Sequence, residues 1–389
     1  MAQSKKSPYF SRRAFLRTAA ALSSIGAITA FLDACSRVGL EIPGVSTPAD
    51  FDIQTTATNT NQPASTPTQQ QHEQQEPTQT FTTEPTKEIT DAMAKIAFVK
   101  TVDRAEGVRK AIQLLGINPV SNKDVFLKPN YNSAHPTPGS THPEVLRTLV
   151  VQFQEMGAKN ITVGDRSGMG DTRKVMDQLG VFAMAQELGF EALVFDELEH
   201  EQWQKYQPAG SHWKNGFLFA KPCLDCDVVV QTCCLKTHQY GGIFTMSLKN
   251  SVGMVAKNDS VTGYDYMREL HTSEHQRRMI AEINTVYSPA LIIMDGVEAF
   301  RNEGPHEGER VPSELVLAGT DRVAIDAVGV AVLQYFDALK DKPAFEQEQI
   351  ARAVELGLGV DGADKIELIT GDAPSAEYAH QINALLMSG

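Results

Sequence analysis

Cysteine, basic charge and long apolar runs are all scarce in this 389-residue sequence. Its five cysteines fall far below the density of a disulfide-stapled scaffold, so the fold must rest mainly on an apolar core. Lys and Arg number 35 against 48 Asp and Glu, which gives a net charge of −13. That balance argues against a nucleic-acid partner, because binding to phosphate backbones needs a concentrated excess of basic residues. The remaining composition, 42% hydrophobic and 21% charged, excludes a wholly disordered or collagen-like chain.

Residues 1–34 have the layout of an export signal. The pair Arg12-Arg13 precedes an apolar run from Thr18 to Leu32, which is shorter than the roughly 20 residues of a membrane-spanning helix. The segment resembles a twin-arginine translocation signal, which implies the twin-arginine translocase as a partner. Leu32-Asp33-Ala34-Cys35 resembles a lipobox, so we expect cleavage before Cys35 and lipidation of its thiol. An uncleaved amphipathic anchor is the alternative.

Residues 35–91 are expected to form a disordered tether. Between Ile53 and Thr90 the chain holds 12 Thr, 8 Gln and 4 Pro with almost no large apolar side chain. Such a segment cannot bury enough apolar surface to offset the entropy lost on ordering. With a lipid on Cys35, the sequence predicts an exported, lipid-anchored protein at the outer face of the cytoplasmic membrane or in the periplasm.

From Lys95 onward, short β-branched runs alternate with amphipathic stretches. This pattern predicts an α/β fold, with a mostly parallel sheet and helices on both of its faces, arranged in one or two lobes over residues 92–375. A C-terminal helix or tail is expected over residues 376–389. The expected strands are 95–100, 124–128, 160–163, 191–195, 227–232, 290–294, 314–318 and 365–370. The expected helices are 104–115, 143–156, 172–188, 243–255, 274–286, 323–336 and 344–356.

Polar residues follow five of these strands directly. In open parallel sheets the ligand crevice lies beyond the carboxyl ends of the strands, so we expect these residues to meet at one edge. The clusters are Lys128-Pro129-Asn130, Gly164-Asp165-Arg166-Ser167-Gly168, Lys236-Thr237-His238, Asp295-Gly296-Val297-Glu298 with Glu303 to Gly308, and Gly319-Thr320-Asp321.

These residues divide into two chemical sets. The first is rich in hydrogen-bond donors that suit phosphate or carboxylate oxygens, and it comprises Lys128, Asn130, Lys236, His238, Lys249 and Asn250. The second consists of carboxylates that suit a divalent cation such as Mg, Mn or Ca, or acid and base work, and it comprises Asp165, Asp295, Glu298, Glu303 and, within a predicted helix, Asp326. A cation held between carboxylates and an anionic substrate would combine both sets.

Several of these candidate site residues also have a purely structural interpretation. A lysine after a strand is often solvated, Asp165 suits a turn or a helix cap, and Asp326 suits bracing of a turn. His271 and His275, at i and i+4 of one helix, would share a face and have a metal-ligand spacing, but they suit surface positions better.

The cysteines of the folded part form a separate motif. Cys223 and Cys226 are followed by Cys233 and Cys234, which allows an iron–sulfur, zinc or thiol redox site. Adjacent residues on a strand face opposite sides, so Cys233 and Cys234 would not both reach one metal without a bulge; three thiolates with His238 would still be possible. Buried free thiols, or one disulfide formed after export, are the alternative.

Several of these motifs occur together in one order along the chain. They are Lys128-Pro129-Asn130, Gly164-Asp165, Lys236-Thr237-His238, Lys249-Asn250-x2-Gly253, Asp295-Gly296, Gly304-Pro305-x2-Gly308 and Asp321-x4-Asp326. Over about Lys95 to Asp372 the chain resembles the family catalogued as domain of unknown function 362. That resemblance implies the α/β fold and the edge residues, and it names no reaction. Some relatives add a ferredoxin-like cysteine segment, whereas the cysteines here have other spacings, so a cluster is not implied.

The leading hypothesis is a metal-assisted enzyme acting on an anionic small molecule. Lys128, Asn130, Lys249 and Asn250 would bind the anion, while His238 and Lys236 would serve in catalysis. Asp165, Asp295, Glu298 and Glu303 would bind the metal. The alternatives are an extracytoplasmic solute-binding receptor without catalysis, and an iron–sulfur or thiol redox protein.

Overall fold

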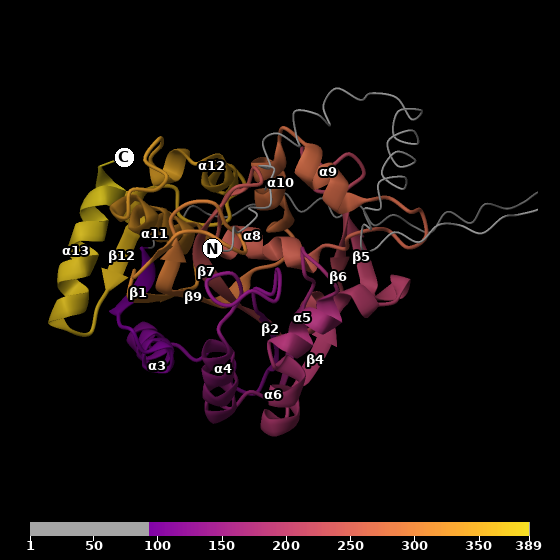
Figure 1. Cartoon of the computed structure of the whole chain (residues 1–389), viewed down its shortest axis with the longest axis horizontal. Helices are drawn as coiled ribbons and strands as arrows, with labels where there is room; N and C mark the ends of the chain where they lie inside the picture. The colour runs from indigo at the N-terminus through magenta and orange to yellow at the C-terminus, as the bar shows by residue number, and fades with distance from the viewer. Residues whose placement is uncertain (1–92, 389) are drawn as a thin grey trace, which may run out of the picture. The chain divides into compact units, whose positions relative to one another are not determined.

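The computed structural model describes residues 93–388. The predicted export signal, the lipidation site Cys35 and the predicted tether lie outside these residues. Within them, no helix is long and apolar enough to cross a membrane. All of residues 93–388 belong to one compact unit built around a single large sheet (Figure 1).

The sheet places strands from both halves of the chain side by side. Its main path, in spatial order, is β12 (Ile366–Ile369), β1 (Ala94–Lys100), β11 (Leu315–Gly319), β9 (Pro289–Phe300), β7 (Val228–His238), β2 (Asp124–Lys128), β3 (Asn160–Asp165) and β4 (Glu191–Val194). Every neighbouring pair on this path is parallel except the two pairs made by β11, which runs antiparallel to both β1 and β9. Two short strands, β8 (Ile243–Thr245) and β10 (Arg310–Val311), pair antiparallel with β7 and β9. The expected α/β fold with a mostly parallel sheet is confirmed.

Helices cover both faces of the sheet, as expected (Figure 1). One face is packed by α3 (Arg104–Leu115), α4 (Pro143–Glu155), α5 (Thr172–Gln178) and α6 (Val181–Leu188). The other is packed mainly by α11 (Arg322–Tyr335), α12 (Glu348–Glu355) and α13 (Ala373–Met387). The C-terminal helix belongs to this core, because Tyr378 and Ile382 are buried in the same cluster as α11.

A third apolar cluster lies around the smaller two-stranded sheet of β5 (Trp203–Tyr206) and β6 (Phe217–Ala220). It includes residues of α9 (Tyr266–Thr272) and α10 (Gln276–Ile283), with the short α7 (Pro222–Asp225) beside β6. This cluster matters for function because α9 closes one side of the pocket described below.

Local sequence explains most element boundaries. The helix expected at 104–115 forms there, because Asp103 accepts a hydrogen bond from the Glu106 amide and Gly116 ends the helix at a φ of 64°. The helix expected at 172–188 is broken into α5 and α6 by Gly180, whose φ is 74°.

The prediction of a helix at 243–255 was wrong. That stretch forms β8, the single-turn α8 (Ser247–Asn250) and the 3₁₀ segment Ser251–Met254. Most of its residues are buried, so the spacing of apolar residues could not distinguish a helix from a buried irregular segment.

Candidate functional site

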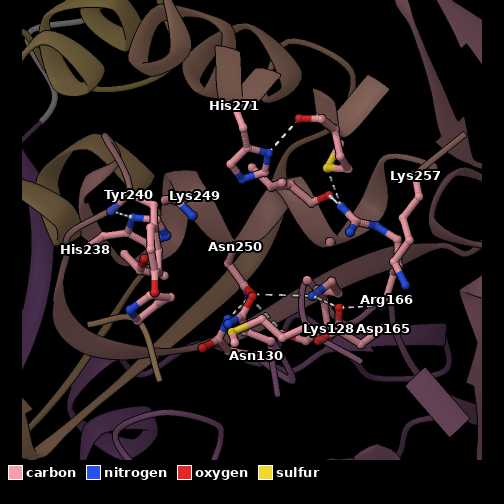
Figure 2. Close-up of a pocket in the computed structure, with 18 of the residues that line it drawn as sticks. Lys128, Asn130, Asp165, Arg166, His238, Tyr240, Lys249, Asn250, Lys257 and His271 are labelled. Carbon is pink, nitrogen blue, oxygen red and sulfur yellow. Dashed lines mark hydrogen bonds and ion pairs between the residues drawn. The ribbon is translucent and has the colours of Figure 1, made fainter. Parts of the chain in front are cut away.

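A pocket with a volume of about 450 Å³ lies at the carboxyl ends of β2, β3 and β7 (Figure 2). Six residues of the predicted site line it, and they come from three strand ends and α8: Lys128, Asn130, Asp165, His238, Lys249 and Asn250. The convergence expected from the parallel strands therefore holds for these residues.

Lys128 and Asp165 form a buried ion pair at the floor of the pocket. Lys128 Nζ lies 2.6 Å from Asp165 Oδ1, and both side chains are almost fully buried. The carboxylate also accepts hydrogen bonds from the amides of Tyr131 and Arg166, each at 2.6 Å. Burial lowers the pKa of Lys128, and the neighbouring carboxylate opposes that effect. The carboxylate of Asp165 therefore already has three partners within the protein, one lysine and two backbone amides.

Gly253 gives this ion pair its space. A Cβ atom at position 253 would lie 2.5 Å from Asp165 Oδ1 and 2.8 Å from Lys128 Nζ, closer than real Cβ contacts allow. The glycine of the Lys249-Asn250-x2-Gly253 motif is therefore explained by close packing against the pair.

Two asparagines connect the ion pair to Lys236. Asn250 Oδ1 accepts from Lys128 Nζ and Asn130 Nδ2, both at 3.4 Å, and Asn130 Oδ1 accepts from Lys236 Nζ at 2.8 Å. Lys236 also donates to the carbonyl of Gly139 at 2.5 Å, and it is fully buried behind Asn130 rather than lining the pocket. Burial lowers its pKa to about 8. Lys236 thus holds Asn130 by a hydrogen bond, and a catalytic role for Lys236 stays a prediction.

Lys249 and His238 lie together on the opposite side of the pocket (Figure 2). Gly242 separates them: a Cβ there would lie 2.7 Å from Lys249 Cε and 2.9 Å from His238 Nδ1. Burial, with Lys236 and Arg166 nearby, lowers the pKa of Lys249 to about 7. Burial, together with the charges of Lys249 and Lys236, lowers the pKa of His238, so its imidazole is neutral.

Backbone partners fix the proton positions of the two histidines in the pocket. The Tyr240 amide donates to His238 Nδ1 at 3.2 Å, so neutral His238 carries its proton on Nε2. His271 Nδ1 lies 2.6 Å from the Met267 carbonyl, which can only accept, so the His271 proton is on Nδ1 and its Nε2 is free to accept. The pocket therefore has one imidazole donor and one imidazole acceptor.

Sequence reasoning did not find every lining residue. Arg166, Lys257, Tyr240 and His271 also line the pocket, as does Thr245, whose buried hydroxyl has no hydrogen-bond partner. Arg166 belongs to the Gly164–Gly168 cluster, in which only Asp165 had a predicted role. His271 and His275 are both exposed, as the surface interpretation predicts. They do not share a helix face, because His271 lies in the last turn of α9, whereas His275 precedes α10 and its ring lies near that of His212.

The four predicted metal-binding carboxylates do not meet at one site. Asp295 is buried within β9 and pairs with Arg104 at 2.9 Å. Glu298 lies 3.5 Å from the same arginine, and Glu303 is exposed in the following loop. Only Asp165 of this set reaches the pocket. Among residues 93–388, no group of three or more His, Cys, Asp or Glu side chains has a geometry that could hold a metal ion.

The direction of β11 explains why the Gly319-Thr320-Asp321 cluster does not reach the pocket. Because β11 is antiparallel to its neighbours, Asp321 lies at the opposite edge of the sheet from the pocket. There it caps α11 by accepting from the amides of Val323 and Ala324. Asp326, in the same helix, is buried and accepts from the amides of Ser247 and Leu248, so it braces α8.

The four cysteines of the described region are free thiols. Cys223, Cys233 and Cys234 are buried, and burial raises the pKa of Cys226 to about 11 and that of Cys234 to about 12. Cys233 belongs to the apolar cluster on the α11 side of the sheet. A redox or metal role for these residues stays a prediction.

The family model described as "Domain of unknown function (DUF362)" matches residues 125–331. The chain belongs to this family. All six predicted residues that line the pocket fall within the DUF362 region.

Among other proteins, the chain is 28% identical over 213 residues to the thylakoid-associated protein sll1697 of a Synechocystis strain. The match covers 54% of this chain and 63% of that protein, so the DUF362 chain spans less than two thirds of the relative's length. Among solved structures, the lactate racemase apoprotein from Thermoanaerobacterium thermosaccharolyticum matches with a TM-score of 0.38 and 14% identity. That match covers 59% of this chain and 54% of the racemase chain.

Proposed function

We propose that the protein binds an anionic small molecule, bearing a phosphate or a carboxylate, in this pocket and acts on it as an enzyme. The observation that carries the proposal is the charge of the lining. Four basic side chains line the pocket, against two carboxylates: Lys128, Arg166, Lys249 and Lys257 against Asp165 and Asp265. In a chain of net charge −13, such a pocket attracts anions that the remaining surface repels.

Both carboxylates are already engaged by the protein. Asp165 is neutralised by Lys128. Asp265 caps α9 by accepting from the Arg268 amide at 2.8 Å. Arg166 donates to the carbonyls of Val252 and Val255, which are neutral groups, and the nearby carboxylates of Asp196 and Asp165 favour its charged form without a direct ion pair among the described residues. Lys257 pairs with Asp196, which does not line the pocket, so Arg166 and Lys249 are the basic groups of the lining that have no ion-pair partner within residues 93–388 and can attract a bound anion.

The two histidines support an enzyme rather than a passive receptor. His238 Nε2–H is a donor that can hydrogen-bond to a substrate oxygen on which negative charge develops. His271 Nε2 is an acceptor that can take a proton from the substrate. Lys249, with its pKa lowered to about 7, changes its charge near neutral pH and so suits proton transfer.

Anion binding is tested by isothermal titration calorimetry of the full chain with sodium sulfate. We expect saturable binding that is weakened about tenfold or more in Lys249→Met, which corresponds to about 1.4 kcal/mol. The control is Lys123→Met, since Lys123 is an exposed residue in the turn before β2. Equal sulfate affinity in all three proteins would contradict the proposal.

The enzyme and receptor alternatives are separated by the ligand itself. The protein purified under native conditions is analysed by mass spectrometry for a bound small anion, which is then incubated with fresh protein. Conversion of that anion, lost in His271→Gln, supports catalysis. Recovery of the unchanged anion after long incubation supports a solute-binding receptor.

We propose further that the chain is exported by the twin-arginine route and anchored by a lipid on Cys35. The Arg12-Arg13 pair, the short apolar run and the Leu32–Cys35 segment support this location. Metabolic labelling with a radioactive fatty acid tests it. Label is expected on the native chain and not on Cys35→Ser, and an unlabelled native chain would refute lipidation.

A further inference from the structure

Among the lysines of the pocket, Lys249 differs in having no hydrogen-bond or ion-pair partner in the part of the chain that the structure describes. Within residues 93–388 its ammonium makes no hydrogen bond or ion pair. Lys128 pairs with Asp165, and Lys257 lies 2.6 Å from Asp196. A side-chain amine that lines a pocket without a partner is free to react with a ligand.

The surroundings of Lys249 favour the neutral amine. No carboxylate of the described region contacts Lys249, and Lys236 and Arg166 add positive charge nearby, so an ammonium at this position is repelled rather than stabilised. Burial acts in the same direction. A lysine that is neutral near physiological pH has a lone pair on nitrogen and is a nucleophile.

The neighbouring imidazoles complete the set of groups that imine formation needs. His238 and Lys249 both pack against Gly242, and His238 presents Nε2–H as a donor. His271 lines the same pocket and presents an unprotonated Nε2. Figure 2 shows His238 and Lys249 on one side of the pocket with His271 above them.

We infer that Lys249 forms a Schiff base with the carbonyl carbon of an anionic aldehyde or ketone, a class that includes 2-oxo acids. The inference rests on the proposed function, since the basic lining would hold the carboxylate or phosphate of the same molecule. It adds the substrate class and the nucleophile.

The step balances without an oxidant or a reductant. The nitrogen lone pair of Lys249 forms the N–C bond while the C=O π pair moves to oxygen, where His238 Nε2–H donates a hydrogen bond. His271 Nε2 takes one proton from the nitrogen and returns it to the oxygen. The nitrogen then forms the C=N bond, the C–O bond breaks, and a solvent proton completes the departing water.

The test is reductive trapping of the full chain with pyruvate as the probe. Sodium cyanoborohydride reduces a protonated imine to a stable secondary amine, which is then located by peptide mass spectrometry. At neutral pH we expect labelling of Lys249 to exceed that of exposed Lys123 by roughly tenfold or more, because an ordinary lysine is almost fully protonated there. Excess sulfate should protect Lys249, and Lys249→Arg should lose the adduct while Lys123→Arg keeps it.

Labelling of Lys249 no greater than that of Lys123 would overturn the Schiff-base inference. Sulfate calorimetry on the same preparation separates the two proposals. Sulfate binding without a Lys249 adduct removes only the Schiff base, whereas loss of both removes the anion pocket as well. A far-ultraviolet circular dichroism spectrum identical to that of the native chain shows that Lys249→Arg is folded.

Discussion

The carboxylate of Asp326 accepts a hydrogen bond from the backbone amide of Ser247 at 2.8 Å. A second bond, from the Leu248 amide at 3.0 Å, joins the same carboxylate to the first turn of α8. Since α8 carries Lys249 and Asn250, a residue of the core helix α11 sets the position of two groups in the pocket. Asp326 is thus a positioning residue.

Replacing Asp326 should weaken both the fold and the site. In Asp326→Ala two buried amides lose their acceptor, which costs about 1–3 kcal/mol for each unsatisfied group. We expect a lower free energy of unfolding in urea and weaker sulfate binding by calorimetry. Asp326→Asn retains one acceptor oxygen and should lie between the alanine variant and the native protein. Unchanged sulfate affinity in a destabilised Asp326→Ala would show that α8 holds its place without this brace.

Asp326 also gives the protein a defined pH dependence of stability. Burial raises its pKa from 3.8 to about 7. Between these values the folded state holds a proton that the unfolded state has released, so the free energy of unfolding falls as pH rises through this window and is level above it. Urea denaturation at several pH values should show this fall in the native protein and a smaller fall in Asp326→Asn. Equal slopes in the two proteins would contradict the assignment.

The Lys128–Asp165 pair should respond differently to single and double substitution. Lys128→Met leaves a buried carboxylate without its cation, and breaking a buried pair in this way typically costs about 3–5 kcal/mol. Lys128→Met combined with Asp165→Asn removes both charges, so we expect part of that loss to be recovered. The comparison is made by urea denaturation of the three proteins. A double variant no more stable than the single one would indicate that the two charges are not coupled.

Sulfate binding should weaken as pH rises through about 7. Sulfate stays doubly charged in this range, so the change reports the protein. Lys249, with a pKa of about 7, is protonated below that value and loses its charge above it. The affinity is therefore expected to fall by up to about tenfold per pH unit above pH 7. In Lys249→Arg the guanidinium stays charged, and the pH dependence near 7 should be absent in calorimetric titrations.

Asp295 should contribute to stability and not to binding. It is buried against Arg104 and does not line the pocket. Asp295→Ala removes the buried partner of Arg104 but leaves Glu298 at 3.5 Å, so we expect a cost below the roughly 3–5 kcal/mol of a fully broken buried pair. We expect a lower urea midpoint together with native sulfate affinity, provided that calorimetry is done where the variant is folded. A loss of sulfate affinity in folded Asp295→Ala would indicate that Asp295 contributes to anion binding.

Local patterns predicted the elements whose ends carry their own signals. The helix at 104–115 and the strand at 124–128 have the expected bounds, because caps and β-branched runs are short-range features. The segment from Ile243 to Val255 could not be predicted this way. Its shape depends on Asp326, 79 residues from Ser247 in the sequence, and on Asn284, which donates to the Leu248 carbonyl.

Local sequence patterns also fail to predict the roles of charged residues whose partners lie far along the chain. Asp165 and Asp295 both follow strongly apolar strand residues, and the sequence offered no way to tell them apart. Asp165 ends β3 and faces the pocket, whereas Asp295 lies inside β9, which continues to Phe300. The extension of β9 arises from pairing with β7 and β10, which no local pattern records.

The sequence by itself determined the α/β class, the family and the set of polar residues that follow β2, β3 and β7, because these features reside in short stretches and because parallel strands end at one edge. Only the tertiary structure decided which of those groups are already neutralised and which stay available. The reversed strand β11, the Arg104–Asp295 pair across 191 residues and the placement of Lys249, which has no partner among residues 93–388, all depend on how distant segments pack. The charge available at a site is set by such contacts, since burial and neighbouring charges determine how each side chain is protonated and paired.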